Sequence, residues 1–257
     1  MNIRIGITPY LNAFPFYTGL VSELRNFQVD FVEGSPSVLN ELIRNGKVYL
    51  SLISSLEYIK SSDQYLVLPN LSISSREHSQ SVGLVWRGKI QELKGQEIFF
   101  SRESFTSVAL LDVLLKERFE IKDATLSPAN GSMDENSPSL VIGDQALHIR
   151  EQLNGSAHFY DLGTLWWEWM KKPFCFALWV VRRDFYQKNR EAVNQIAEIL
   201  RKRVAVNLSE IPVHLKEYLL NFDYSLSPDI LQGLFLFYER AAKLGWVNRI
   251  KDVEFIL

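Results

Sequence analysis

The sequence contains little from which a metal, disulfide or thiol-based redox site could be built. Its 257 residues include one cysteine, Cys175, so an internal disulfide and a cysteine-based zinc site are excluded. Cys175 lies in the apolar segment 173–177, where we expect a buried, inert thiol rather than a nucleophile. Four histidines are present and widely spread: His78, His148, His158 and His214. Because they form no HExxH-type pair, we expect neither a metal site nor a cofactor.

Long apolar runs and an excess of charge are also missing. No segment approaches the roughly 18 apolar residues of a membrane helix, and residues 1–7 alternate like a strand rather than a signal-peptide core. The net charge is -2, and lysines and arginines are scattered among acidic neighbours, so no basic stripe for nucleic acid is present. We therefore expect a cytoplasmic protein without nucleic-acid or membrane partners. Its oligomeric state stays open.

Familiar catalytic motifs are absent too. The chain has no G-x-G-x-x-G, no Walker loop and no G-x-S-x-G nucleophile elbow. His78 could serve as a base, but in the polar loop 74–78 we expect it at the surface. Arg102 could bind a carboxylate through its planar guanidinium, or stay solvated in its turn. The three tryptophans of 166–169 are expected to form a packing wedge rather than a substrate platform.

The sequence does show a regular alternation of strands and helices. Strand patterns lie at 3–7, 27–33, 48–53, 82–86, 96–101, 139–143, 158–162 and 174–182. Helix patterns lie at 36–46, 56–59, 108–119, 144–149, 164–171, 184–208, 212–220 and 228–244. We expect a loop at 125–138, and a helix cap at Asp144. This order predicts an α/β fold of two strand-helix blocks followed by a helical C-terminal tail.

Two of the strand patterns, 82–86 and 174–182, bracket the second block. We interpret them as strands that cross between an outer lobe and an inserted lobe, a hinge that permits clamshell closure. The first lobe is then discontinuous, residues 1–85 plus 180–257, and the second lobe spans 86–179. In open α/β lobes of this kind, ligands bind beyond the carboxyl ends of the strands.

Small and polar residues follow the predicted strands at those ends. They are Asn12, Ser54, Ser55, Ser101, Thr106, Ser107, Gly143 and Asp144. Hydroxyls and backbone N–H groups at helix starts can bind an anion without a fixed positive charge. Taken singly, each is better explained as part of a helix cap. Their shared position at the strand ends is what indicates a site for a small organic anion.

Several short motifs, in order from residue 3 to about 184, resemble the chorismate dehydratases of menaquinone biosynthesis. They are Tyr10-Leu11-Asn12 with Pro15, Ser55-Leu56-Glu57-Tyr58, Ser81-Val82, Thr106-Ser107-Val108, Val141-Ile142-Gly143-Asp144-Gln145-Ala146-Leu147, Asp161-Leu162-Gly163 with Trp166, and Pro173-Phe174-x-Phe176-Ala177-x-Trp179. Each motif is short, and the combination is what is specific. The chain departs from the family at Tyr49, where an Asp is usual, and at Met170-Lys171-Lys172, where Thr-Gly-Leu is usual.

The resemblance implies a two-lobed, type II periplasmic-binding-protein-like fold. It implies a lyase that removes water from chorismate to give 3-[(1-carboxyvinyl)oxy]benzoate, the entry step of the futalosine route to menaquinone. It places Asn12 and Ser81 at the reacting part of the cleft, and Thr106 and Ser107 on a substrate carboxylate. We expect the rest of the binding wall to comprise Tyr10, Ser54, Ser55, Ser101, Gly143 and Asp144.

No carboxylate or histidine at the predicted strand ends is an obvious base, since Asp144 is expected to cap its helix. We therefore expect Asn12 and Ser81 to orient and polarise the substrate, while the proton passes to the substrate's own enolpyruvyl carboxylate in a cleft that excludes water. Two other functions stay open. One is a non-catalytic cytoplasmic binding protein for small carboxylates. The other is the sister dihydroxynaphthoate synthase, whose typical Ser-Pro-Cys-Pro-Asn-Asp opening differs from 8–12 here.

Overall fold

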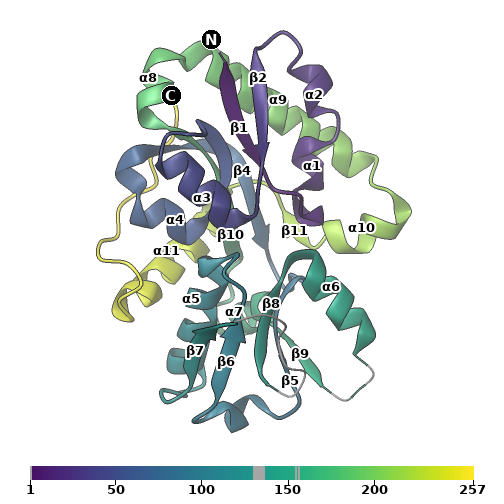
Figure 1. Cartoon of the computed structure of the whole chain (residues 1–257), viewed down its shortest axis with the longest axis vertical. Coiled ribbons are helices and arrows are strands. Elements are labelled where there is room, and N and C mark those ends of the chain that lie inside the picture. The colour runs from purple at the N-terminus through teal and green to yellow at the C-terminus, as the bar shows by residue number, and fades with distance from the viewer. Residues whose placement is uncertain (1, 130–136, 154, 156) are drawn as a thin grey trace.

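The computed structural model of the chain describes residues 2–129, 137–153, 155 and 157–257. One sheet is built from β1 (Ile3–Ile7), β2 (Val29–Glu33), β3 (Leu50–Ser54), β4 (Tyr65–Ser75), β10 (Phe174–Arg182) and β11 (Phe222–Asp223). A second sheet is built from β5 (Val82–Trp86), β6 (Glu97–Phe100), β7 (Thr125–Pro128), β8 (Ser139–Ile142) and β9 (His158–Asp161). Each sheet forms the centre of one lobe (Figure 1). The predicted two-lobed α/β fold is therefore confirmed.

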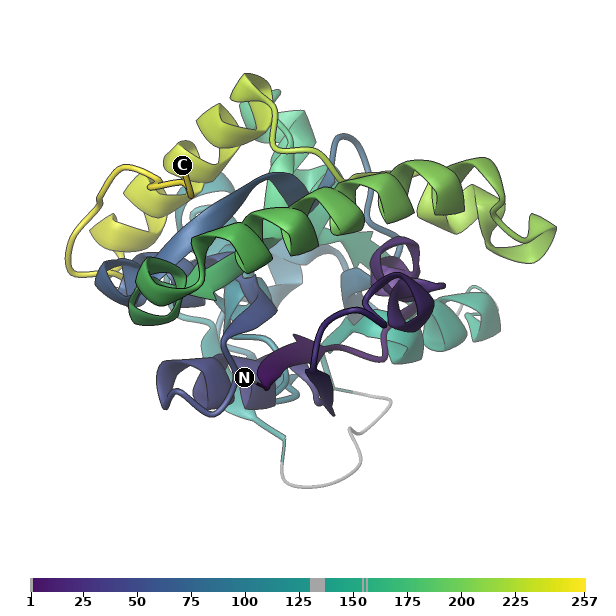
Figure 2. The ribbon, with the colours of Figure 1, turned by 90° about the horizontal axis from the view of Figure 1, so that it is seen from above.

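Helices cover both sheets. They are α1 (Phe14–Tyr17), α2 (Leu20–Glu23), α3 (Pro36–Arg44), α4 (Ser55–Lys60), α5 (Phe105–Val113), α6 (Gly143–Gln152), α7 (Leu162–Met170), α8 (Arg183–Lys188), α9 (Arg190–Ser209), α10 (Val213–Leu219) and α11 (Pro228–Lys243). Short 3-10 turns occupy Leu11–Ala13, Ser62–Gln64 and Ile90–Leu93, and a π-helical turn over Leu114–Arg118 continues α5. Seen from above, the long α9 crosses the lobe that contains the first sheet (Figure 2).

The carboxyl ends of β1, β3, β6 and β8 lie toward the other lobe, whereas the antiparallel β5 and β10 run the opposite way (Figure 1). The first sheet runs β11-β4-β10-β3-β1-β2, and β1 pairs in parallel with β2 and β3. The second runs β7-β6-β8-β5-β9, and β6 pairs in parallel with β7 and β8. The helices that follow β3, β6 and β8 are α4, α5 and α6, so three helix starts stand at strand ends. Ligand sites in α/β sheets form at such ends.

The crossing between the sheets differs from the expected pair of crossing strands. β5 pairs only with second-sheet strands and β10 only with first-sheet strands. The chain passes between the sheets in two short connections, 76–81 and 171–173. We therefore propose that the lobe boundaries lie in these connections, because divisions at 85 and 180 would cut β5 and β10.

One carboxylate ties both connections to the start of α11. Asp229 accepts ion pairs from Lys172 at 2.7 Å and from Arg76 at 3.3 Å. Exposed pairs of this kind contribute about 0–1 kcal/mol each. These two ion pairs alone are therefore too weak to hold the two connections in one position.

Two segments form strands where loop was expected or no element was predicted. β4 is the longest strand, although Pro69 and the left-handed Asn70 (φ 59°) interrupt its pattern. β7 occupies the start of the expected loop 125–138 and pairs with β6 at the edge of its sheet. Residues 130–136 of that expected loop lie outside the described residues. The helix expected over 184–208 is broken at Asn189 into α8 and α9.

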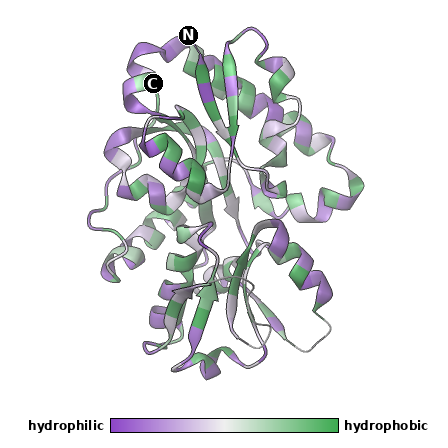
Figure 3. Cartoon of the chain, in the orientation of Figure 1, coloured by the Kyte–Doolittle hydropathy of each residue, from purple (hydrophilic) through white to green (hydrophobic). Residues whose placement is uncertain are grey.

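The core lies on the inner strands, where apolar residues gather (Figure 3). All five residues of β3 are buried, which fits its central position. Trp166 is fully buried and meets Phe174 and Phe237 edge-on at 5.4 and 6.3 Å, so this tryptophan packs as predicted. Full burial of a large apolar side chain stabilises the fold by about 1.5–3 kcal/mol relative to exposure. Cys175 is also buried, as expected.

Candidate active site

A small cavity lies between the lobes, at the strand ends where the sequence placed the anion site. Its wall comprises Thr8, Tyr10, Asn12, Pro36, Leu52, Ile53, Ser54, Ile73, Val82, Ser104, Ser107, Ile142, Gly143, Phe176, Ala177 and Phe222. Five of the ten residues predicted from the sequence are among them: Tyr10, Asn12, Ser54, Ser107 and Gly143. The cavity volume is about 70 Å³. An engineered cavity of about 150 Å³ holds a benzene ring, so the lobes must part to admit a ring-shaped ligand.

The lobes are closed by hydrogen bonds that cross the cavity rim. The Tyr10 hydroxyl donates to Glu103 Oε2 at 2.8 Å, and the Ser37 N–H donates to the Glu103 carbonyl oxygen at 3.1 Å. The Leu11 N–H donates to Asp144 Oδ1 at 3.1 Å. Burial and the Glu103 carboxylate raise the pKa of Tyr10, so its hydroxyl remains a donor.

Gly143 is required at its position by both conformation and space. Its φ of +64° lies in the left-handed region, which glycine adopts without a Cβ penalty. An added Cβ would lie 3.1 Å from the Tyr10 ring. The absence of a side chain therefore lets α6 begin directly against Tyr10.

Asn12 contributes a side-chain amide to the cavity wall. It lies in the 3-10 turn Leu11–Ala13 that follows β1, is partly exposed, and lines the cavity. Within the described part of the chain, its side chain forms no hydrogen bond, so both the amide N–H₂ and the carbonyl oxygen are free for a ligand. The structure thus places Asn12 on the cavity wall.

The two serines after β3 have different environments. Ser54 caps α4: its Oγ accepts from the Glu57 N–H at 3.4 Å and from Asn40 Nδ2 at 3.0 Å. Ser55 is fully buried and lies outside the cavity wall, and its Oγ has no partner among the described residues. Ser54 therefore both caps α4 and lines the cavity, whereas Ser55 lies behind the cavity wall.

The hydroxyl residues after β6 also differ in whether they line the cavity. Ser107 lines the cavity and shares a hydrogen bond of 3.2 Å with Ser104, which also lines it. The Thr106 Oγ1 accepts from the Leu56 N–H at 3.0 Å and is buried outside the wall. Ser101 is partly exposed and outside the wall as well. In the closed form, Thr106 therefore links the starts of α5 and α4 rather than presenting its hydroxyl to the cavity.

Asp144 does not cap its helix, contrary to the sequence expectation. α6 begins at Gly143, so Asp144 stands in its first turn, and its carboxylate accepts from Leu11 in the other lobe. Burial raises the pKa of Asp144, and the bond from Leu11 opposes that effect. Asp144 is outside the cavity wall and serves lobe closure instead.

Ser81 lies immediately behind the cavity wall. It is fully buried, its carbonyl oxygen accepts from the Gly143 N–H at 2.8 Å, and the next residue, Val82, lines the cavity. Its Oγ accepts from the Tyr218 hydroxyl at 2.8 Å and donates to the Ser79 carbonyl oxygen at 3.3 Å. The serine predicted at the reacting part is therefore adjacent to the cavity and already engaged in hydrogen bonds.

The cavity wall combines helix starts with neutral side chains. The described residues of its wall include no Asp, Glu, Lys, Arg or His. The starts of α3, α4, α5 and α6 meet there through Pro36, Ser54, Ser104 and Gly143. A helix start carries roughly +0.5 elementary charge, and Glu57 and Asp144 in the first turns of α4 and α6 offset part of it. The Thr8 Oγ1, buried and without a partner in the described structure, adds a further hydroxyl.

The sequence did not predict several residues of this region. Thr8 and Ser104 lie within four residues of predicted site residues, and the same strand-end argument would have found them. Phe176, Phe222 and Tyr218 come from β10, β11 and α10, far along the chain. The helical tail carries no local pattern that would place Tyr218 against Ser81.

The two departures from the family pattern lie away from the cavity. Tyr49 precedes β3 and stacks on Phe185 at 4.4 Å, with Arg4 over its ring. Lys171 adopts the left-handed conformation (φ 52°) that ends α7, and Lys172 pairs with Asp229. Since none of these lines the cavity, the departures alter packing and helix ending rather than its wall.

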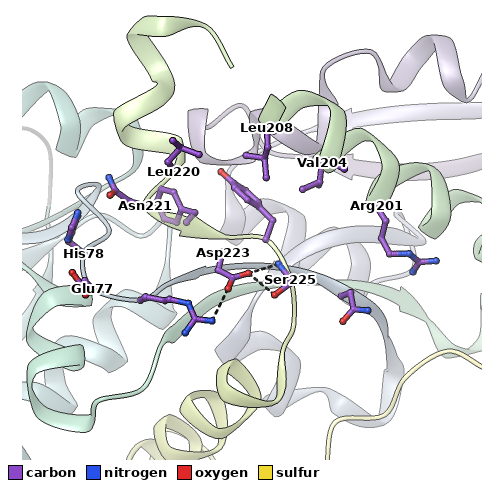
Figure 4. A pocket seen from close by; sticks show the side chains of 14 residues that line it. Glu77, His78, Arg201, Val204, Leu208, Leu220, Asn221, Asp223 and Ser225 are labelled. Atoms are coloured by element: carbon purple, nitrogen blue, oxygen red, sulfur yellow. Dashed lines mark hydrogen bonds and ion pairs between the residues drawn. The ribbon is translucent and has the colours of Figure 1, made fainter. Parts of the chain in front are cut away.

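A second, larger hollow of about 700 Å³ lies beside Phe222, which lines both hollows (Figure 4). Its cations are already paired, Arg76 with Asp223 at 3.3 Å and Arg201 with Glu198 at 2.7 Å. His78 lies here, away from the small cavity, so it is not positioned as a base for that site.

The described residues include no group of three or more His, Cys, Asp and Glu that could hold a metal ion. In the same part of the chain, none of the helices is both long and apolar enough to span a membrane.

Comparison with known proteins gives relatives over nearly the whole chain. Residues 3–243 match the family described as "Menaquinone biosynthesis". A protein of Thermus thermophilus named chorismate dehydratase is 32% identical over 267 residues, which cover 91% of this chain and 93% of that protein.

Solved structures share the fold at low sequence identity. A protein of Archaeoglobus fulgidus has a TM-score of 0.66 and 19% identity, with 96% of this chain and 98% of that chain covered. The periplasmic aliphatic sulphonate binding protein SsuA of Escherichia coli has a TM-score of 0.66 and 15% identity, with coverages of 98% and 90%. A Candida albicans protein described as having the generic periplasmic binding protein fold has a TM-score of 0.68 and 10% identity, with coverages of 98% and 93%. The predicted periplasmic-binding-protein-like fold is therefore confirmed.

Proposed function

Because this chain belongs to the menaquinone-biosynthesis family, we propose that it is a cytoplasmic lyase that dehydrates chorismate to 3-[(1-carboxyvinyl)oxy]benzoate. The similarity to the Thermus thermophilus chorismate dehydratase supports this substrate. The observation that carries the proposal is the cavity itself: four helix starts and neutral hydrogen-bonding side chains converge where a dicarboxylate would bind. The partial positive charge of helix starts suits the carboxylates of chorismate.

Substrate binding follows from the free groups of the wall. The uncapped N–H groups at the start of α5 and the hydroxyls of Ser104 and Ser107 suit one carboxylate. The Ser54 cap at the start of α4, together with Thr8, suits polar groups at the opposite wall. Closure through Tyr10, Leu11 and Asp144 then separates the substrate from water.

The reaction itself requires loss of a proton from C3 and of hydroxide from C4. The electrons of the C3–H bond form the new ring double bond as the C4–O bond breaks, and the ring becomes aromatic. The proton passes to the substrate's enolpyruvyl carboxylate, because the described wall holds no carboxylate or imidazole that could take it, and the resulting acid returns it to the departing hydroxide, so that water leaves. Asn12 donates its free amide N–H to the departing oxygen, and Ser81 supports the same region from behind Gly143.

Variants of these two residues test the proposal. Asn12→Ala and Ser81→Ala should each lower the rate of product formation from chorismate by about 100-fold, the size expected for loss of one preorganised donor. Asn221→Ala is the matched control, because Asn221 lies outside the small cavity and its side chain, among the described residues, donates to the Glu217 carbonyl oxygen one turn earlier. Near-normal turnover by both site variants would refute the assignment. Chorismate that binds and is recovered unchanged would identify a binding protein instead.

A further inference from the structure

The turn that contains Ser81 is fixed by one carboxylate. Asp161 accepts from the Ser79 N–H at 3.1 Å, from the Ser79 hydroxyl at 3.0 Å and from the Gln80 N–H at 2.6 Å. The same carboxylate caps α7 by accepting from the Thr164 N–H at 2.9 Å. Gln80 is held in the left-handed region with φ 61°, which costs energy for a residue with a side chain. The backbone before Ser81 is therefore held in one strained conformation.

Gly163, the second residue of α7, allows the Ser79–Ser81 turn to lie close to this helix. A Cβ on Gly163 would lie 2.7 Å from Ser75 Oγ and 3.2 Å from the Ser79 N–H nitrogen. Only glycine leaves room for the Ser79–Ser81 turn to pack on the first turn of α7. The Asp161-Leu162-Gly163 motif is thus explained as the support of the Ser81 turn, and not by direct contact with the cavity.

The hydroxyl of Ser81 is fixed separately, from the helical tail. Tyr218 on α10 donates to Ser81 Oγ at 2.8 Å and is only 6% exposed. Its ring packs edge-on against Phe222, which lines the cavity, with centroids 5.3 Å apart. Burial raises the pKa of Tyr218, so the phenol keeps the proton that it donates to Ser81 Oγ. The Ser81 proton must therefore point elsewhere, either to Ser79 or toward the substrate.

We propose that Tyr218 is a positioning residue that acts through Ser81, aiming the serine O–H at the substrate and strengthening it as a donor when the lobes close. Tyr218 belongs to the lobe of the first sheet, and Ser81 precedes β5 of the second, so the bond depends on how the lobes meet. A hydroxyl that accepts one hydrogen bond donates a stronger one, because the two bonds polarise each other. This role rests on the proposed function, since it concerns the same reaction.

A neighbouring tyrosine provides a matched control. Tyr224 is as deeply buried as Tyr218, and both rings contact Phe222. Its hydroxyl, however, has no hydrogen-bond partner among the described residues. Tyr224→Phe therefore removes a buried hydroxyl from the same cluster without breaking any bond to Ser81.

The test compares kcat and KM for chorismate in five proteins: wild type, Tyr218→Phe, Ser81→Ala, the double variant and Tyr224→Phe. Tyr218→Phe should lower kcat about tenfold, as expected for loss of one hydrogen bond, and leave KM within about twofold. In the Ser81→Ala background, Tyr218→Phe should have no further effect, because the residue through which it acts is gone. Tyr224→Phe should keep wild-type kcat.

The results that would contradict the positioning role differ from those that would contradict the proposed function. Unchanged kcat in Tyr218→Phe, or losses that multiply in the double variant, would overturn the positioning role while leaving the proposed function intact. A wild type that leaves chorismate unconverted would overturn the proposed function and this role with it. Thermal unfolding shows whether Tyr218→Phe folds. If it does not, 3-fluorotyrosine at position 218 retains the ring and alters donor strength, and an unchanged kcat would then refute the proposal.

Discussion

Replacing Gly143 with alanine tests how the cavity wall and lobe closure depend on each other. Gly143 has φ +64°, and an added Cβ would lie 3.1 to 3.3 Å from three atoms of the Tyr10 ring. The left-handed conformation costs a residue with a Cβ about 1–2 kcal/mol. In a chain of this length, about 1 kcal/mol corresponds to roughly 2–4 °C in Tm. We therefore expect Gly143→Ala to lower Tm by about 2–8 °C.

A second effect follows from the displaced ring. The Tyr10 hydroxyl closes the lobes by donating to Glu103 at 2.8 Å, and a hydrogen bond to a charged group contributes about 1.5–3 kcal/mol. A shift of a few tenths of an ångström forfeits part of that energy and so destabilises the form that closes over bound substrate through the same hydrogen bond. The KM for chorismate should therefore rise about tenfold, as a loss of about 1.4 kcal/mol predicts.

Gly95→Ala is the matched control for this prediction. Gly95 is also left-handed, with φ +70°, but an added Cβ there meets no described atom within 4 Å. It should lower Tm by a similar amount and leave KM unchanged. Thermal unfolding and steady-state kinetics on both variants separate backbone strain from contact with Tyr10. An equal rise of KM in both variants, or none in Gly143→Ala, would refute the reasoning.

Two further predictions concern stability. Lys171→Gly should stabilise the fold by roughly 0.5–1 kcal/mol, because Lys171 ends α7 with φ 52° and glycine avoids that strain at a smaller entropic cost. Thermal unfolding measures this change, and a lower Tm in the variant would count against the strain argument. Burial raises the pKa of the Cys175 thiol to about 12. Because an unfolded thiol titrates near 8.5, the contribution of Cys175 to stability should be fully present below about pH 8 and be lost as pH rises from 8.5 toward 12, which urea unfolding of wild type and Cys175→Ala at pH 8 and 10 can measure. Cys175 should also react with a thiol reagent only as the protein unfolds, and rapid labelling of the native state would contradict the observed burial.

Local sequence patterns were sufficient for most of the fold. β1, β5 and β10 have the predicted bounds, since each is a short apolar run between clear breakers. β4 was not predicted, because Pro69 and Asn70 interrupt its alternation of apolar and polar residues. Pairing with β10 makes the segment a strand. Sheet formation there is decided by a partner about 100 residues away in sequence, which no local pattern reveals.

The candidate site was predictable to the extent that it lies at strand ends. Asn12, Ser54, Ser107 and Gly143 line the cavity because each follows an inner strand directly or opens a helix there. Thr106 shows the limit of the argument: the sequence identifies a hydroxyl at a helix start, but only the closed lobes show that it binds the Leu56 N–H. Contacts across the lobes depend on tertiary closure.

The central claim is that this cavity converts its ligand and does not merely hold it. Purified protein incubated with chorismate, with products separated by chromatography and read by absorbance, tests it most directly. We expect many turnovers to 3-[(1-carboxyvinyl)oxy]benzoate without an added metal or cofactor, and a loss of about 100-fold in Asn12→Ala. Chorismate recovered unchanged after saturating binding would contradict the account.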